Sequence, residues 1–169
     1  MGTEINNVAG IVRVHGAGRP DHLALIEGDR RLTWGEVAER SRRTAQALAS
    51  QGVGAEDRVA FLDKNGIEHF DVFFGASLLN AVAVDVNWRL APPEVEFIVN
   101  DAEAKVLVVG PDFVDLVDTI KDNLTTVQKI LVVADADGNT ADGYEDFGTW
   151  ISGFPDDDPG AEGGPGDVA

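Results

Sequence analysis

The chain has 169 residues, 44% of them hydrophobic, and carries 13 basic against 30 acidic side chains, for a net charge of −17. This length and composition predict one globular domain with a core of its own. The negative charge argues against nucleic acid and anionic membranes as partners, because both would be repelled. The absence of cysteine excludes thiolate nucleophiles and thiolate metal sites. The sequence contains no run of 18 apolar residues, so no transmembrane segment is predicted. Without a signal-peptide pattern, the expected location is the cytoplasm.

The first fifty residues predict a helix, a β-hairpin and a second helix. Apolar residues recur at helical spacing as far as His15, after which glycines and a proline interrupt the pattern. Two strand-like runs flank Gly28-Asp29-Arg30, which predicts a hairpin with a three-residue turn. Thr33 and Glu36 have the spacing of a capping box, and the helix that they open is expected to end at Gly52.

From residue 58 onward, short apolar runs alternate with helical patterns. Near-continuous Val, Leu and Ile runs are typical of strands that are covered on both faces of a parallel sheet. The predicted strands are 59–62, 81–86, 105–109 and 130–133. The fold class is therefore α/β, with a mostly parallel sheet flanked by helices and an N-terminal β-hairpin.

Two features of this alternating region point to the carboxyl edge of the sheet. Asn65 and Glu68 have the spacing of a capping-box-like helix start, and Asn80 is expected to close that helix. After the next strand, Asn87-Trp88-Arg89-Leu90 forms a basic corner ahead of a helix that Pro92-Pro93 begins. Arg89 is thus the best-placed cation for an anionic ligand, because doubly wound folds bind ligands at this edge.

Other motifs carry less weight. The glycine patterns at 16–18 and 52–54 follow helices, whereas a dinucleotide-binding loop follows a strand, so turns are predicted there. The three histidines are isolated in the sequence, and no metal site is predicted. Arg40, Arg42 and Arg43 are expected to form a solvated helix face with nearby glutamates as partners.

Asp63 and Asp85 leave a function of another class open. Both lie at or near the ends of predicted parallel strands, where a stand-alone flavodoxin-like binding or signalling module would place a phosphoacceptor. Such a module also needs an adjacent acidic pair after its first strand, whereas here Asp135 and Asp137 follow the last strand. An aspartate at a strand end more often caps a helix or a turn.

The composition changes after the last predicted strand. Residues 130–169 contain ten Asp or Glu, eight Gly and three Pro, and no Lys or Arg. Four apolar residues between 144 and 151 have the spacing of one amphipathic turn. The organisation predicted is an α/β unit over 1–153 and an acidic, Gly- and Pro-rich linker over 154–169.

Taken together, these segments resemble the amino-terminal portion of the acyl-CoA synthetases, also called fatty-acid–CoA ligases, of the adenylate-forming (AMP-binding) superfamily. The resemblance covers nearly the whole chain, and it rests on the order and spacing of motifs that are individually weak. The motifs are 32–37, 52–60, 75–85, 87–95 and 105–109.

The resemblance implies a two-step ligase. A carboxylate attacks the α-phosphate of ATP with Mg to give an acyl-adenylate, and the thiol of CoA then opens it. The first step needs a Ser/Thr/Gly/Lys phosphate loop, an acidic metal ligand and a catalytic Lys, and the sequence contains none of these. In the family the loop follows a segment like 167–169, so we expect an inactive fragment that stops just short of it, with no catalytic residue of its own.

Binding residues and partners are also implied by the resemblance. Arg89 matches an arginine that contacts CoA phosphates in some relatives, although Trp88 stands where the family usually has a small residue or proline. A carboxylic (fatty) acid and CoA are the expected partners of the full-length enzyme. In a fragment, a strand edge and the helix faces of Phe70, Phe73 and Phe74 would lack cover, so self-association is expected.

Overall fold

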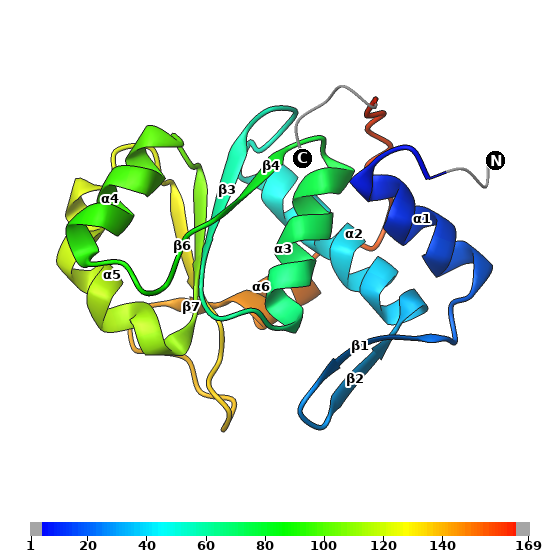
Figure 1. The fold of residues 1–169 in the computed structure, drawn as a ribbon, viewed down its shortest axis with the longest axis horizontal. Helices are drawn as coiled ribbons and strands as arrows, with labels where there is room; N and C mark the ends of the chain where they lie inside the picture. Colours follow the sequence, from blue (N-terminus) through cyan, green and yellow to red (C-terminus); the bar gives the residue numbers. More distant parts are fainter. Residues whose placement is uncertain (1–4, 165–169) are drawn as a thin grey trace.

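A computed structural model describes residues 5–164 of the chain (Figure 1). Its centre is a five-stranded sheet in the order β4-β3-β5-β6-β7, and all of its strand pairs are parallel. The predicted alternation of strands and helices is therefore confirmed. The elements of this region are β3 (Arg58–Leu62), α3 (Ile67–Leu78), β4 (Val82–Asp85), α4 (Pro92–Asp101), β5 (Val106–Val109), α5 (Val114–Ile120) and β6 (Lys129–Val132).

An amino-terminal layer precedes the sheet and contains α1 (Val8–Gly18), β1 (Leu23–Glu27), β2 (Arg30–Thr33) and α2 (Trp34–Ser50). The capping box that opens α2 is confirmed. The predicted three-residue hairpin turn is wrong, because Glu27 pairs with Arg30 and leaves Gly28 and Asp29 alone in the turn. Gly28 has φ +56°, the left-handed conformation that two-residue hairpin turns require.

Helices cover both faces of the sheet, as the apolar strands predicted. Alternate residues of β3 enter two separate cores: Val59 and Phe61 belong to the core with α2, α3 and α6, on which α1 packs from outside, whereas Ala60 and Leu62 pack with α4 and α5. Figure 1 shows these two groups on opposite sides of the strands. Because successive side chains of a strand point to opposite faces of the sheet, alternate residues of one strand contact different helices.

Helix α3 crosses α2 at short distance. A Cβ added at Gly75 would lie 2.6 Å from Cγ2 of Thr44, so glycine is what lets the two helices approach. The helix ends before Asn80, which has φ +57° and closes it as predicted. Asparagine tolerates this left-handed conformation better than other residues with a Cβ.

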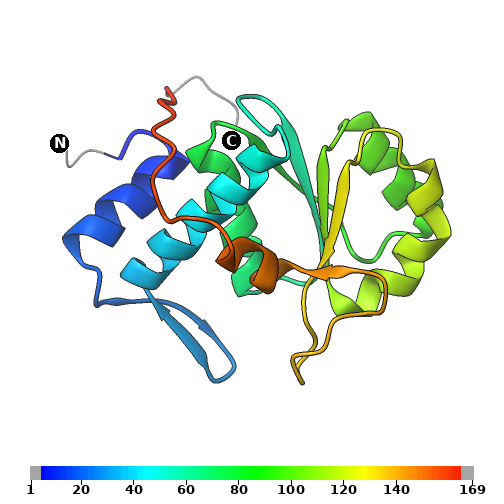
Figure 2. The same ribbon diagram turned by 180° about the vertical axis from the view of Figure 1, so that it is seen from behind.

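The carboxyl-terminal region adds a strand that was not predicted, β7 (Glu145–Asp146), and a short helix, α6 (Phe147–Ser152), where one amphipathic turn was expected. Residues 154–164, called the acidic strap below, contain no helix or strand and run along α2 towards α1 (Figure 2). The strap is held by Arg13, which binds Asp158 at 2.7 Å, and by Asn7, which donates to the carbonyl of Gly163 at 2.8 Å. Over the described range, none of the helices has the length and hydropathy that a membrane crossing needs.

Candidate functional site

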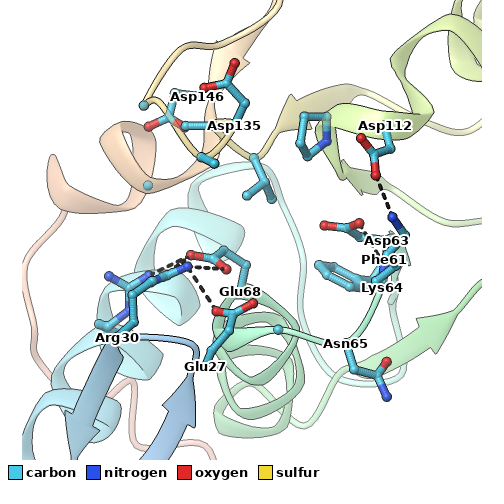
Figure 3. Close-up of a pocket in the computed structure, with 18 residues that line it drawn as sticks. Glu27, Arg30, Phe61, Asp63, Lys64, Asn65, Glu68, Asp112, Asp135 and Asp146 are labelled. Atoms are coloured by element: carbon cyan, nitrogen blue, oxygen red, sulfur yellow. Dashed lines mark hydrogen bonds and ion pairs between the residues drawn. The ribbon is translucent and has the colours of Figure 1, made fainter.

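A cleft of about 610 Å³ lies at the carboxyl edge of the sheet (Figure 3). Segments that follow β3, β5 and β6 form its floor, the hairpin β1–β2 and the start of α3 form one wall, and the start of α6 closes the far end. Its lining includes six carboxylates and three cations. The cations are Arg30, Arg40 and Lys64, and the carboxylates are those of Glu27, Asp63, Glu68, Asp112, Asp135 and Asp146.

Asp63, one of the two predicted strand-end aspartates, lies in this cleft. Its carboxylate accepts a hydrogen bond from the backbone N–H of Lys64 at 2.7 Å. Burial raises the pKa of Asp63, and the nearby charge of Asp112 adds to the increase. The carboxylate also fills the space beside Gly110, since a Cβ there would lie 2.0 Å from Cγ of Asp63. Only a glycine at position 110 leaves room for this side chain.

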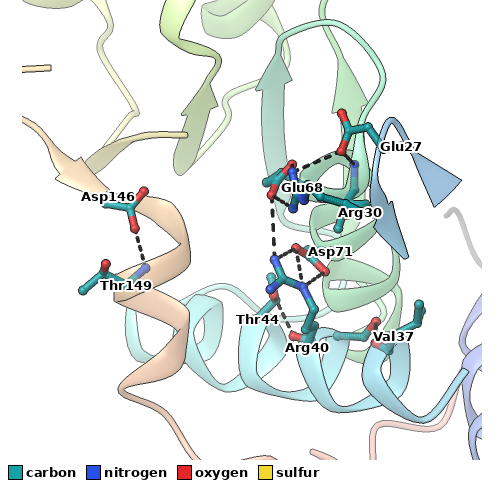
Figure 4. Close-up of polar contacts among 11 residues, drawn as sticks. Glu27, Arg30, Val37, Arg40, Thr44, Glu68, Asp71, Asp146 and Thr149 are labelled. Carbon is teal, nitrogen blue, oxygen red and sulfur yellow. Dashed lines mark hydrogen bonds and ion pairs between the residues drawn. The ribbon is translucent and has the colours of Figure 1, made fainter. Parts of the chain in front are cut away.

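A chain of alternating charges runs along the wall of the cleft and into the core (Figure 4). Glu27 and Arg30 are 3.1 Å apart, Arg30 and Glu68 2.5 Å, Glu68 and Arg40 3.9 Å, and Arg40 and Asp71 2.5 Å. These five residues, called the charge ladder below, join the hairpin, α3 and α2. Its outer end is exposed and its inner end is buried, because the side chain of Arg30 is 51% exposed and that of Asp71 is 3% exposed.

The inner end of the ladder corrects one expectation. Arg43 does pair with Glu39, at 3.0 Å, as predicted, but the helix face is not fully solvated, because Arg42 and Arg43 also donate to the backbone carbonyls of Asp156 and Phe154 in the acidic strap. Arg40 instead binds the buried carboxylate of Asp71 through both Nε and Nη2. Burial raises the pKa of Asp71, and the Arg40 guanidinium opposes this increase. The sequence pattern missed the pair because its members lie 31 positions apart.

The expected capping box at the start of α3 is also wrong. Asn65 does not cap this helix, whose N-cap residue is Gly66, without any side-chain cap bond. Glu27 of the hairpin supplies the acceptor instead, because its Oε2 lies 3.3 Å from the backbone nitrogen of Ile67. A carboxylate near a helix N-terminus is favourable for both its free N–H groups and its dipole. Asn65 lines the cleft and is exposed.

Arg89 lies at the end of the neighbouring strand β4, beside rather than within the cleft. Its backbone N–H donates to Oδ1 of Asn87 at 3.0 Å, which fixes the corner. Its guanidinium lies 3.9 Å from the ring centroid of Trp88, is exposed, and has no carboxylate partner within residues 5–164. Trp88 is half-buried and packs near Phe113.

The two predicted strand-end aspartates do not share a site. Asp85 is exposed at the end of β4 and lies 3.0 Å from Nε2 of His69, and it does not line the cleft around Asp63. Among the residues that the structure describes, no three His, Asp or Glu side chains are grouped so that they could hold a metal ion. The carboxylate of Asp135 accepts hydrogen bonds from the backbone N–H groups of Asp137 and Asn139 and so stabilises a turn.

The comparison with protein families matches residues 12–167 to the AMP-binding enzymes. The chain belongs to the AMP-binding enzyme family. The chain is 40% identical over 114 residues to a long-chain-fatty-acid–CoA ligase of Thermus thermophilus, a match that covers 68% of this chain and 20% of the relative. It is 32% identical over 152 residues to a 3-hydroxybenzoate–CoA ligase of Aromatoleum, with 90% and 28% covered.

Solved structures agree with this family assignment. The N-terminal domain of FACL13 from Mycobacterium tuberculosis superimposes with a TM-score of 0.83 at 31% identity, covering 96% of this chain and 40% of that one. Our chain spans only 20% and 28% of the length of the two curated relatives named above. The expected α/β fold of an adenylate-forming enzyme's amino-terminal part is confirmed.

Proposed function

We propose that this chain is the amino-terminal part of a carboxylic acid–CoA ligase, in which it forms one wall of the reaction site and is inactive alone. The observation that carries the proposal is the match of residues 12–167 to the AMP-binding family, with a fatty-acid–CoA ligase among the relatives. In the complete enzyme a fatty or other carboxylic acid would attack ATP to give an acyl-adenylate and pyrophosphate. CoA would then displace AMP to form the thioester.

The composition of the cleft supports the view that ATP and Mg are held by other parts of the enzyme. A triphosphate needs backbone N–H groups and cations around it, whereas this cleft has twice as many carboxylates as cations. The described residues also lack a group that could hold a metal ion. ATP with Mg therefore does not fit the residues that line this cleft, and no step of the reaction is assigned to them.

The test is acid-dependent ATP–pyrophosphate exchange by the purified 169-residue chain, with a full-length relative as the positive control. We expect exchange at background for any fatty acid, because the chain lacks the groups that stabilise the transition-state charge. Clear acid-dependent exchange would overturn the proposal that the chain is inactive alone.

Arg89 is the residue of this chain that we propose contacts a CoA phosphate. Its support is an exposed guanidinium without a carboxylate partner in the described part of the chain. In the longer protein, Arg89→Ala should weaken CoA use about tenfold to a hundredfold, the effect of losing one charge-assisted contact worth ~1.5–3 kcal/mol. Adenylate formation should change little, and an unchanged CoA dependence would return Arg89 to a purely structural role.

We also propose that the isolated chain self-associates. Among the described residues, the edge strand β4 pairs only with β3, and open strand edges are templates for pairing. Phe74 is buried and Phe70 and Phe73 are half-buried, so these three side chains do not form the uncovered faces that were expected. The exposed apolar side chains that support self-association are Leu23 and Ile26 of the hairpin and Phe97 of α4. Light scattering at moderate salt is the test, and a monodisperse monomer at high concentration would contradict the proposal.

A further inference from the structure

The loop between β3 and α3 contains an asparagine that is followed by a glycine. In the whole sequence, Asn65-Gly66 is the only such pair, and every other asparagine precedes a residue with a Cβ. Asparagine is a thermolabile residue, because its side-chain amide can be attacked by the backbone nitrogen of the next residue. A Cβ on that next residue crowds the nitrogen, whereas glycine leaves it accessible. Asn65 is therefore the asparagine of this chain with the least obstructed neighbour.

The structure leaves both reacting groups without a competing hydrogen bond. Asn65 is exposed and lies outside any helix or strand, and its side chain points away from the charged groups of the cleft in Figure 3. Within residues 5–164, its amide has no hydrogen-bond partner. Gly66 is the N-cap of α3, and its N–H has no acceptor in the same range. No contact among these residues therefore holds the amide away from the nitrogen.

The hairpin gives a reason for glycine at position 66. A Cβ there would lie 2.6 Å from Oε1 of Glu27, whose Oε2 lies 3.3 Å from the backbone nitrogen of Ile67. A larger residue at 66 would push this carboxylate away from the start of α3. The contact that joins the hairpin to α3 thus also keeps the Gly66 nitrogen unobstructed.

We propose that Asn65 is a deamidation site, at which slow conversion to aspartate and isoaspartate adds a carboxylate to the cleft. The Gly66 nitrogen bonds to Cγ of Asn65, the Cγ–Nδ2 bond breaks, and Nδ2 leaves as ammonia with the proton that the Gly66 nitrogen gives up. Water then opens the resulting succinimide. Addition of water at Cγ breaks the new Cγ–N bond and gives aspartate. Addition at the backbone carbonyl carbon breaks the original peptide bond and gives isoaspartate. This proposal does not depend on the proposed function.

The two products should affect α3 differently. Aspartate leaves the backbone unchanged and places a negative charge near the helix N-terminus, where it is favourable. Isoaspartate carries the chain through Cγ and so lengthens the backbone by one atom directly before Gly66. We expect this change to separate the Ile67 amide from Glu27. Both products make the cleft more acidic, and it already has twice as many carboxylates as cations.

The chain offers a matched control for Asn65. Asn139 is also exposed and also lies in a loop, but it is followed by Thr140, whose branched side chain crowds the peptide nitrogen. Asp137-Gly138 and Asp142-Gly143 could form the same ring, but an aspartate gains no charge when the ring opens. Separation by charge therefore reports only reactions of asparagine.

The experiment ages the 169-residue chain in a mildly alkaline buffer and separates the products by anion exchange. Electron-transfer fragmentation in a mass spectrometer then locates the modified residue and distinguishes isoaspartate from aspartate. We expect the first acidic species to carry the change at residue 65, as a mixture of both products. Asn65→Gln should abolish this species, because the longer side chain forms the ring much more slowly. Gly66→Ala should slow it several-fold, and Asn139→Gln should leave its rate unchanged.

A further variant separates the effect of the glycine from that of the hairpin contact. Gly66→Ala also displaces Glu27, whereas Glu27→Ala removes the carboxylate and keeps the glycine, so it should still deamidate at Asn65 as fast as the unaltered chain or faster. The proposal is overturned if the first acidic species maps to another asparagine, or if Asn65→Gln forms it at the rate of the unaltered chain. Unfolding midpoints verify that each variant is folded.

Hydrogen exchange of the separated products tests the effect on α3. The Ile67 amide should exchange faster in the isoaspartate form than in the Asn65→Asp variant, which has the same charge and an ordinary backbone. Equal exchange rates in these two chains would overturn the expected displacement of Glu27.

Discussion

The two sides of the sheet differ in the polarity of the side chains buried there. The side covered by α2, α3 and α6 contains the buried polar residues Ser41, Thr44 and Asp71, whereas the core under α4 and α5 consists of apolar side chains throughout the described range. The hairpin that forms one wall of the cleft lies on the same side of the sheet as these buried polar residues. Buried charge is thus confined to the side on which the hairpin has to be positioned.

This difference indicates what the charge ladder contributes. Apolar residues of similar volume often stabilise a fold as well as a buried ion pair or better, because desolvation of the charges offsets their attraction. The ladder instead specifies how the hairpin and α3 lie relative to α2, since Glu68 lies between the guanidinium groups of Arg30 and Arg40, and Arg40 also binds Asp71. We infer that the apolar face contributes mainly stability and the polar face mainly geometry.

Breaking the inner pair should have the largest effect. Arg40→Ala leaves the carboxylate of Asp71 buried without a partner and should lower the free energy of unfolding by about 3–5 kcal/mol. The deficit should shrink as the pH is lowered, because burial already raises the pKa of Asp71 and the protonated form is neutral. Urea unfolding at several pH values measures this. The double variant Arg40→Leu/Asp71→Leu should recover most of the loss, and Arg42→Ala on the same helix is the control.

A matched pair of substitutions compares the two faces directly. Val99→Thr places a hydroxyl in the apolar core and should cost about 1–3 kcal/mol, because Val99 is fully buried and the core there is apolar. Thr44→Val removes a hydroxyl that donates to the Arg40 carbonyl at 2.9 Å and should cost only about 0.5–1.5 kcal/mol. Equal costs in thermal unfolding would contradict the distinction between the faces.

The contact between the hairpin and α3 should be more easily displaced than the core. A Cβ at Gly66 would lie 2.6 Å from Oε1 of Glu27, which is the far end of a flexible side chain. Gly66→Ala should therefore push Glu27 away and cost less than about 1 kcal/mol overall, the worth of one exposed hydrogen bond. Hydrogen exchange should accelerate at the Ile67 amide, which loses its acceptor, and exchange unchanged at this amide would show that Glu27 does not cap α3.

The smallest effect is expected at the acidic strap. Arg13 holds the pKa of Asp158 below its ordinary value. A lowered pKa means that the contact is fully formed above the unfolded value of about 3.9 and is lost as the pH falls through the folded value. The two side chains are 31% and 36% exposed, so solvent screens the contact and the change should stay below about 1 kcal/mol. An NMR titration of Asp158 measures it, and Asp158→Asn should abolish the pH dependence of the strap signals.

Local patterns predicted most of the fold, and contacts between distant segments account for what was missed. The capping box of α2 and the closure of α3 at Asn80 depend on neighbouring residues, and both were predicted correctly. Strand β7 was missed because its two residues are acidic and carry no apolar signal. In the site, the positions of Asp63 and Arg89 followed from strand ends, whereas the role of Glu27 at α3 depends on a residue 40 positions away.

The close contact between Asp63 and Gly110 has a consequence for the evolution of the family. The two positions directly follow the neighbouring strands β3 and β5, and the carboxylate occupies the volume that a Cβ at 110 would need. Position 110 is then not free to change alone, whereas a smaller residue at position 63 is compatible with the glycine. In an alignment of relatives, a side chain at the position of Gly110 should coincide with a smaller residue at the position of Asp63, so that the two columns covary although each looks locally tolerant.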